Sequence, residues 1–208
     1  MSPHRTKRAI VFDFGGVLMK TLDYGPRRAL DARLGLPPGH VERIVHASES
    51  WRKAQMGLIT PDAYRADVAS HLGLNVAEMP EFMATYFSGD VLDTGLVDYI
   101  RELRQEEFTV GLLSNASIEL DDQLYTLGIA SLFNPLVISA RIGVMKPEPA
   151  AYRAVLDRLG RPAEEIVFID DMPANIEGAR MVGMAGLLYV NGMDLRAELE
   201  PMYFLTTI

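Results

Sequence analysis

Carboxylate, hydroxyl and amide side chains follow directly after three apolar runs of this chain. An apolar run without polar alternation is typical of a parallel strand covered on both faces. In an open α/β sheet, the carboxyl ends of such strands meet at one edge, and reactive groups lie just beyond it. We therefore expect three groups of side chains at the same edge: Asp13 after residues 9–12, Ser114 and Asn115 after residues 109–113, and Asp170 and Asp171 after residues 166–169.

The three carboxylates Asp13, Asp170 and Asp171 would repel one another at this edge unless a cation lay between them. The chain contains no cysteine. Oxygen ligands without sulfur or nearby imidazole favour a hard ion such as Mg²⁺. Two glycines, Gly15 and Gly16, follow the first carboxylate and would let the backbone turn sharply and approach a ligand closely.

A metal at this position would have a chemical role, because it could neutralise an oxygen of a phosphate group. Asp13 could then attack phosphorus as a carboxylate nucleophile and form an aspartyl-phosphate. The hydroxyl of Ser114, the amide of Asn115 and the ammonium of Lys146 would surround the remaining phosphate oxygens. Each residue alone also has an ordinary interpretation as a turn, helix-cap or exposed loop residue. Their joint placement after strands favours the site.

The elements around these residues alternate between strand and helix in the second half of the chain. This order predicts a doubly wound parallel sheet of the α/β class. Strands are expected at residues 9–12, 109–113, 136–138, 166–169 and 186–190, and helices over residues 96–103, 120–127, 151–159 and 176–182.

A predominantly helical segment separates the first strand from the others. We expect four helices there and no strand, and hence a small helical domain at residues 19–89 inserted into an α/β core at residues 1–18 and 90–208. Apolar spacing from Val41 through Ser48 to Trp51 indicates one helix face. Thr60-Pro61 and Asn75 with Glu78 are typical helix starts.

Composition limits the class of protein further. The chain has 208 residues, of which 49% are hydrophobic and 23% charged, and a net charge of −8, which argues against nonspecific nucleic-acid binding. No apolar stretch approaches the roughly 20 residues that cross a bilayer. We interpret the basic residues 2–8 as the approach to the first strand and not as a signal peptide, and we expect a cytoplasmic protein.

Four ordered segments of the chain resemble the motifs of the haloacid dehalogenase (HAD) superfamily: residues 13–17, residues 112–115, Lys146-Pro147 and residues 168–175. The resemblance implies a Rossmann-like core, and the helical insertion resembles a C1-type cap. It implies that Asp13 is the nucleophile and that Ser114 and Lys146 bind phosphate. It further implies that Mg²⁺ is held by Asp13, the backbone carbonyl of Gly15 and Asp171, with Asp170 assisting and Asn175 just behind them.

The chain departs from the family pattern at one position. Most phosphatases of the superfamily carry a second aspartate two residues after the nucleophile, where this chain has Gly15. That aspartate protonates the leaving group, and loss of a positioned acid typically removes about 10² to 10⁴ in rate. A slower reaction, an easier leaving group or an acid from the cap are the three possibilities.

The resulting expectation is a Mg²⁺-dependent phosphomonoesterase that acts on a small phosphorylated metabolite, with no nucleic-acid or membrane partner. One alternative is a 2-haloacid dehalogenase, in which Asp13 would attack carbon without a metal. The other is a binding protein that keeps the fold without turnover. Substrate identity and oligomeric state stay open.

Overall fold

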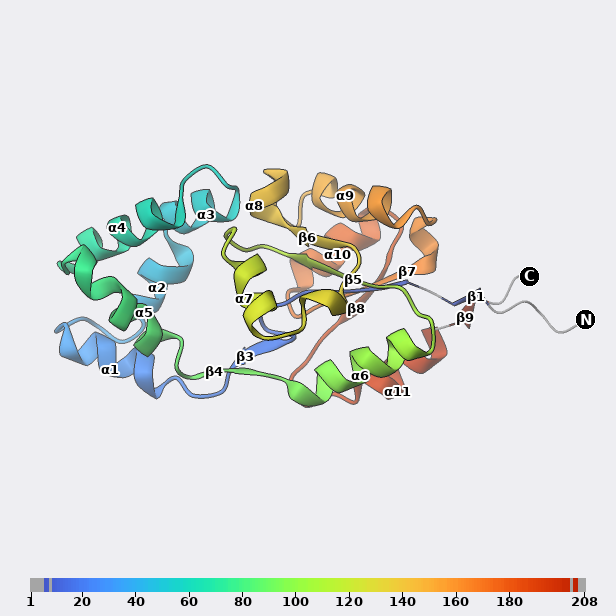
Figure 1. The fold of residues 1–208 in the computed structure, drawn as a ribbon, viewed down its shortest axis with the longest axis horizontal. Coiled ribbons are helices and arrows are strands. Elements are labelled where there is room, and N and C mark those ends of the chain that lie inside the picture. The colour runs from blue at the N-terminus through green and yellow to red at the C-terminus, as the bar shows by residue number, and fades with distance from the viewer. Residues whose placement is uncertain (1–5, 8, 203, 206–208) are drawn as a thin grey trace, which may run out of the picture.

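The computed structural model describes residues 6–7, 9–202 and 204–205. It contains a core built on a five-stranded parallel sheet and a group of helices to one side of it (Figure 1). The sheet order is β6-β5-β2-β7-β8, so β2, which precedes Asp13, is the central strand. These strands are β2 (Ala9–Phe12), β5 (Val110–Ser114), β6 (Leu136–Ile138), β7 (Ile166–Asp170) and β8 (Ala185–Leu188).

Both faces of the sheet are covered, as the apolar strands predict. Every residue of β2, β5 and β7 is buried. Helices α6, α7 and α11 cover one face and α9 and α10 the other (Figure 1). Their bounds are α6 (Thr94–Gln105), α7 (Leu120–Thr126), α9 (Pro149–Leu159), α10 (Pro173–Met181) and α11 (Leu195–Leu199), and a short helix, α8 (Ser139–Ile142), follows β6.

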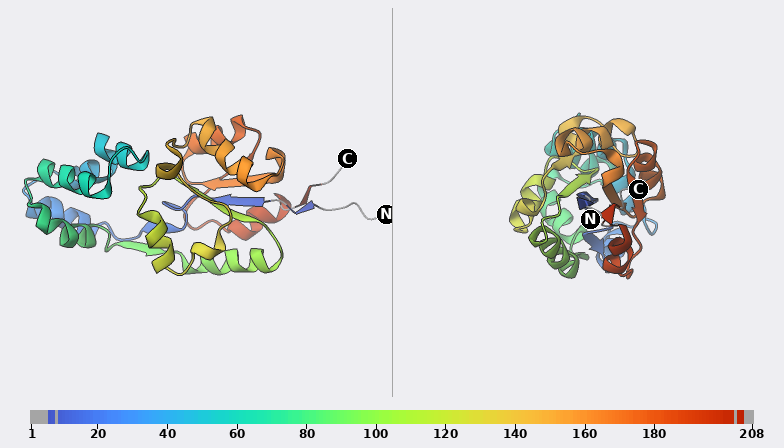
Figure 2. Two further views of the ribbon diagram at one scale, coloured as in Figure 1. Left: turned by 45° about the horizontal axis from the view of Figure 1, so that its top comes forward. Right: turned by 90° about the vertical axis from the view of Figure 1, so that its right-hand side faces the viewer.

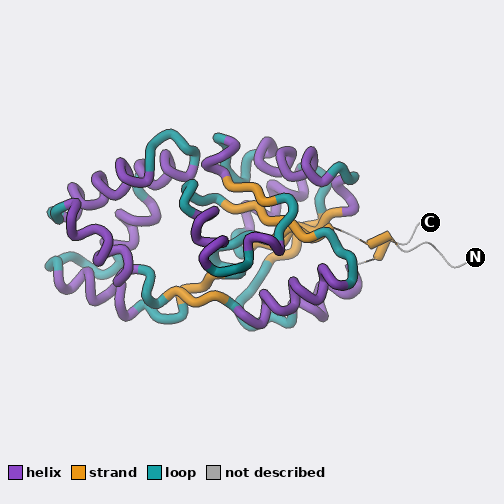
Figure 3. Tube along the Cα trace, viewed as in Figure 1, coloured by secondary structure: helices purple, strands orange, loops and turns teal. Residues whose placement is uncertain are grey.

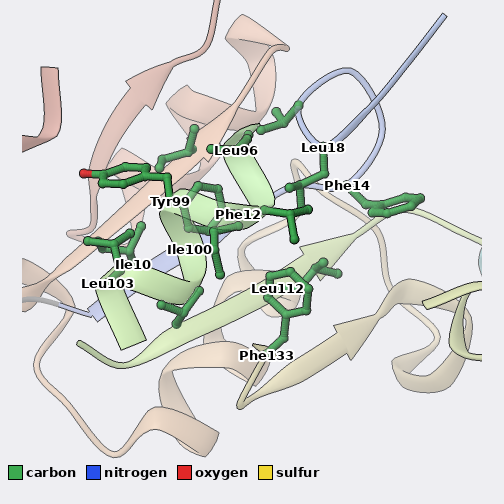
Figure 4. Close-up of a cluster of buried hydrophobic side chains, with 14 of the residues drawn as sticks. Ile10, Phe12, Phe14, Leu18, Leu96, Tyr99, Ile100, Leu103, Leu112 and Phe133 are labelled. Atoms are coloured by element: carbon green, nitrogen blue, oxygen red, sulfur yellow. The ribbon is translucent and has the colours of Figure 1, made fainter. Parts of the chain in front are cut away.

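Alternate residues of β2 belong to different hydrophobic clusters. Ile10 and Phe12 pack with the α6 side chains, among them Ile100, in the cluster of Figure 4. Ala9 and Val11 pack on the opposite face with α9 and α10. This alternation follows from the period of two along a strand. It fixes the central strand, and hence the residue that follows it, from both sides.

Residues 19–89, which we call the cap, lie beside the core and are joined to it by two short strands (Figure 2). These are β3 (Met19–Thr21) and β4 (Asp90–Leu92), which pair antiparallel. A separate hydrophobic cluster, drawn from residues 30–86, holds the cap helices together. The division into cap and core stays a prediction. The cap helices are α1 (Gly25–Arg33), α2 (His40–Ala47), α3 (Glu49–Gln55), α4 (Pro61–Leu72) and α5 (Met79–Tyr86).

The number of cap helices and the absence of a strand were wrongly predicted. The structure has five α-helices in this segment instead of four, and β3 begins within it (Figure 3). The helix expected to run through Ser48 is split there, because Ser48 adopts an extended backbone and its hydroxyl accepts a hydrogen bond from the Trp51 N–H as the N-cap of α3. The predicted helix starts at Thr60 and Asn75 are confirmed.

Shorter elements complete the fold. A strand pair, β1 (Thr6–Lys7) with β9 (Phe204–Leu205), lies apart from the main sheet. The 3-10 turns are η1 (Val76–Glu78), η2 (Ala130–Leu132), η3 (Ala163–Glu165) and η4 (Glu200–Met202). Of the basic segment at residues 2–8, all but Thr6 and Lys7 lie outside the described residues. Within the part of the chain that is described, no helix is long and apolar enough to span a bilayer.

Candidate active site

Strand register brings the predicted polar residues to one edge of the sheet. Phe12 pairs with Leu112 on one side and with Ile169 on the other. Asp13 is therefore level with Asp170 and lies one residue short of the level of Ser114. The carboxyl ends of β5, β2 and β7 thus carry these side chains together, as the sequence pattern predicts.

Asp13 has one occupied oxygen and one free oxygen. Its Oδ1 accepts a hydrogen bond of 2.7 Å from the Phe14 N–H and lies 2.8 Å from the Lys146 Nζ. Its Oδ2 has no hydrogen-bond partner among the described residues. The backbone N–H of Asp13 donates to the Ile169 carbonyl at 2.9 Å, which anchors the residue to β7. The carboxylate is therefore oriented by one oxygen and has the other available for attack.

Lys146 is buried between two carboxylates. Its Nζ donates to Asp170 Oδ2 at 2.6 Å and pairs with Asp13, and the residue is only 3% exposed. The chain there is held by Asn115, whose Nδ2 donates to the Lys146 carbonyl and whose Oδ1 accepts from the Lys146 N–H, both at 2.8 Å. The sequence placed the Asn115 amide beside a substrate phosphate; in the structure this amide instead fixes the backbone of Lys146.

Both oxygens of Asp170 already have donors. Besides Lys146, they accept hydrogen bonds from the Met172 N–H at 2.8 Å and from the Asn175 Nδ2 at 3.0 Å to each oxygen. Asn175 is itself held through its carbonyl, which accepts from the Tyr152 hydroxyl at 2.7 Å. Asn175 therefore lies behind the carboxylates, where the resemblance expects it. Asp170 is fully buried, and its carboxylate holds the Lys146 ammonium in place.

Asp171 lies over Gly16 at the open side of the cluster. A Cβ atom added to Gly16 would come within 2.1 Å of Asp171 Oδ2, and Gly16 has a φ of +80°. Only glycine fits there without displacing the carboxylate. Asp171 is half-buried, and no lysine or arginine forms an ion pair with it in the described ranges.

Carboxylate oxygens of Asp13, Asp170 and Asp171 lie within 4.8 Å of one another. Burial raises the pKa of Asp13 to about 6; Lys146 opposes this rise and Asp170 adds to it. Burial, together with Asp170, also raises the pKa of Asp171. One buried lysine does not compensate three carboxylates, so the donor set and its charge fit a hard divalent cation such as Mg²⁺.

The two remaining predicted residues lie at the same edge. Ser114 is 3% exposed at the end of β5, and its hydroxyl makes no hydrogen bond within the described part of the chain. Gly15 is exposed, and a Cβ added to it would meet no atom within 4 Å. Open space thus lies where the superfamily's usual second aspartate would project.

A family model described as haloacid dehalogenase-like hydrolase matches residues 7–183. The chain belongs to this family. Sesquiterpene phosphatase astK from Aspergillus oryzae is 28% identical over 198 residues, which cover 95% of this chain and 97% of that protein. Phosphatase MT3486 from Mycobacterium tuberculosis is 29% identical over 196 residues, 86% of each protein. Other relatives are longer, and the chain spans 36% and 38% of the length of two of them.

Solved HAD structures share the fold. An enzyme of the HAD family from Bacteroides thetaiotaomicron, determined in complex with magnesium and inorganic phosphate, superposes with a TM-score of 0.77 at 24% identity, over 93% of this chain and 99% of that one. The parallel five-stranded sheet is accordingly the Rossmann-like core of the family. The chain is a HAD-like hydrolase.

Sequence reasoning missed two residues outside the motifs of this hydrolase, Gln55 and Ser139, which bond the segment directly after Ser114. The Gln55 side chain of α3 donates to the Asn115 carbonyl at 2.8 Å. Ser139, at the start of α8, donates to the Gln55 carbonyl at 2.6 Å. Gln55 and Asn115 are 60 positions apart, and no spacing pattern connects them. The sequence offers one signal, a serine directly after an apolar strand, and this signal indicates Ser139 and not Gln55.

Proposed function

We propose that this HAD-like hydrolase is a Mg²⁺-dependent phosphomonoesterase that acts on a small phosphorylated metabolite through an aspartyl-phosphate on Asp13. The observation that carries the proposal is the Asp13 carboxylate, which has one oxygen oriented by Phe14 and Lys146 and the other free, beside a carboxylate cluster with excess negative charge. The two relatives named as phosphatases support it.

In the proposed reaction, the free oxygen of Asp13 attacks phosphorus and the substrate oxygen departs with the bonding electrons. Water then attacks the phosphorus of the aspartyl-phosphate, which releases inorganic phosphate and restores the carboxylate. The Ser114 hydroxyl and the Lys146 ammonium hold the phosphate oxygens during both steps.

Mg²⁺, when bound, would neutralise charge on the transferred phosphoryl group. We assign its ligands to the Asp13 and Asp171 carboxylates and the Gly15 carbonyl. Asp170 assists from behind, because its oxygens are occupied by Lys146, Met172 and Asn175. In this assignment the cap covers the site and selects the substrate.

The dehalogenase alternative differs in its charge requirement. A 2-haloacid is an anion that would approach Asp13 without a metal, and the uncompensated carboxylates beside Asp13 would repel it. The clustering of Asp171 with Asp13 therefore favours the phosphatase.

The deciding experiment measures phosphate release from a panel of phosphorylated metabolites with and without Mg²⁺. The panel includes sugar phosphates, acyl phosphates and an isoprenoid monophosphate, the last because one relative is a sesquiterpene phosphatase. Chloroacetate and 2-chloropropionate serve as halide-release controls. Phosphate release that EDTA abolishes supports the proposal, whereas halide release in EDTA would replace it with dehalogenation, and the absence of both would favour a binding protein.

A further inference from the structure

Gln55, the last residue of α3, forms hydrogen bonds to the core through both its side chain and its backbone carbonyl. The Gln55 side chain donates to the Asn115 carbonyl at 2.8 Å, and the Gln55 carbonyl accepts from the Ser139 hydroxyl at 2.6 Å. The same hydroxyl accepts from the Ala116 N–H at 3.0 Å. The last residue of a cap helix therefore bonds Asn115, directly after Ser114, and it also bonds Ser139, which in turn holds Ala116.

The hydrogen bonds continue from this segment to the catalytic lysine. The Asn115 side-chain amide accepts a hydrogen bond from the Lys146 N–H and donates one to the Lys146 carbonyl. The Lys146 ammonium lies 2.8 Å from Asp13 and 2.6 Å from Asp170. Lys146 thus receives its backbone position from Asn115 alone among side chains in the described ranges. Gln55 lies one hydrogen bond beyond Asn115.

The turn after α3 is seated on α8 without room for a side chain. Gly57 has a φ of +69°, and a Cβ added to it would come within 2.3 Å of the Ala140 carbonyl oxygen. Figure 1 shows this turn and α8 side by side. Any larger residue at position 57 must push the turn away from the core, and Gln55 would move with it.

We propose that Gln55 is a positioning residue that couples the seating of the cap on the core to the placement of Lys146. This inference rests on the proposed phosphatase function for its kinetic consequence, although the coupling itself is a property of the fold. When α3 lies against the core, Gln55 holds Asn115, and Asn115 in turn holds the backbone of Lys146. When α3 leaves, Asn115 loses its bond to the cap, and Lys146 is located less tightly against Asp13.

The first test replaces Gln55 with methionine, which keeps the volume and removes the donor. The matched control is Arg65→Met, because Arg65 of α4 also bonds the core, at Glu119 with a distance of 2.6 Å, but contacts neither Asn115 nor Lys146. With Mg²⁺ and acetyl phosphate, Gln55→Met should lower kcat by about 10- to 100-fold, the effect of a displaced catalytic group. Arg65→Met should change kcat less than threefold, and neither variant should change the affinity for Mg²⁺.

The second test displaces the turn without touching Gln55. Gly57→Ala should reduce kcat as Gln55→Met does, because the new methyl group meets the Ala140 carbonyl. Gly73→Ala is the control: Gly73 is also in the cap, with a φ of +66°, but its added Cβ would meet nothing within 4 Å. The two glycines have nearly the same φ, +69° and +66°, so the difference in kcat between the two variants reports the contact with Ala140.

A readout that needs no turnover separates this inference from the proposed function. The Lys146 amide proton is bonded to Asn115, so its hydrogen exchange reports whether Lys146 is held. Exchange should accelerate at least tenfold in Gln55→Met and Gly57→Ala and stay unchanged in the two controls. If the parent protein released no phosphate, the proposed function would fail while the exchange result still decided the coupling. Parent-like exchange and kcat in Gln55→Met, or an equal loss in Arg65→Met, would overturn the inference.

Discussion

At the scale of single residues, the two neighbouring aspartates of the cluster have different surroundings and hence different roles. Asp170 is buried and accepts four hydrogen bonds. Asp171 is half-buried, and no described lysine or arginine forms an ion pair with it. We expect Asp170→Ala to destabilise the metal-free protein by about 3 kcal/mol, because the Met172 N–H and the Asn175 amide lose their acceptor and the buried Lys146 loses one of its two carboxylate partners. Asp171→Ala should leave that stability nearly unchanged.

The stabilisation by magnesium should show the reverse order: Asp171→Ala should be affected more than Asp170→Ala. At a concentration about 100 times its dissociation constant, Mg²⁺ stabilises a protein by about 2.7 kcal/mol, which thermal unfolding detects. Asp171→Ala should lose this stabilisation and Asp170→Ala should keep part of it. A full magnesium response in Asp171→Ala would remove Asp171 from the proposed ligands.

Burial of Asp13 predicts a pH dependence of stability. Its pKa rises from 3.8 to about 6 in the folded protein. Between these two values the folded state holds a proton that the unfolded state has lost, so stability falls as pH rises through this window and stays reduced above about pH 6. Asp13→Asn lacks the ionisation. The free energy of unfolding, measured by urea denaturation in EDTA, should therefore fall less between pH 5 and pH 7 in Asp13→Asn than in the parent; equal decreases would contradict the raised pKa of Asp13.

Gly15 leaves the site without a group at the usual acid position, and the kinetics should reveal this. The rate should depend steeply on the pKa of the leaving group, so that acyl, aryl or anomeric phosphates are preferred to alkyl phosphates. Gly15→Asp is sterically open, since its Cβ meets nothing within 4 Å and its backbone is outside the left-handed region. It should raise kcat/KM most for poor leaving groups.

The measurement is log kcat/KM against leaving-group pKa for the parent, Gly15→Asp and the control Gly15→Ala. A flat plot for the parent would point to a substitute acid in the cap, for which His40, His46 and Glu49 are the first candidates.

At the scale of elements, one helix supplies the cap of another. Helix α2 begins after Gly39, which has no side chain to cap it. The buried Asp31 of α1 accepts hydrogen bonds from the Gly39 N–H at 2.7 Å and the Val41 N–H at 2.8 Å. Asp31→Ala should cost about 1–3 kcal/mol in the free energy of unfolding, because the buried Val41 N–H and the part-buried Gly39 N–H lose their acceptor. Asp31→Asn retains one acceptor and should cost less; an Asp31→Ala variant within 0.5 kcal/mol of the parent would contradict this role.

Elements whose signal is local could be predicted from the sequence, and those that depend on a distant partner could not. The apolar runs at β2, β6 and β7 predicted their strands within a residue. The break at Ser48 was missed because the apolar period continues across it, although serine is a common N-cap. Strands β3 and β4 lie about 70 positions apart in the sequence and are stabilised by pairing with each other, so no local pattern predicts them.

At the scale of the whole molecule, the sheet explains why much of the candidate site could be predicted. Once the strands were placed, parallel register brought Asp13, Ser114 and Asp170 to one edge. What could not be predicted is which polar atoms are already occupied. Asn115 holds Lys146 through a contact between two loops that are 31 positions apart, and Gln55 reaches Asn115 from the cap.

The most direct test of the central claim traps the covalent intermediate. The protein is mixed with Mg²⁺ and acetyl phosphate, quenched, and treated with borohydride, which reduces an aspartyl-phosphate to homoserine. Mass spectrometry of the digested protein should then find homoserine at position 13 in the parent and none in Asp13→Asn, which should also lose more than 100-fold in turnover. Phosphate release with an intact Asp13, or with the reduced residue elsewhere in the chain, would contradict the account.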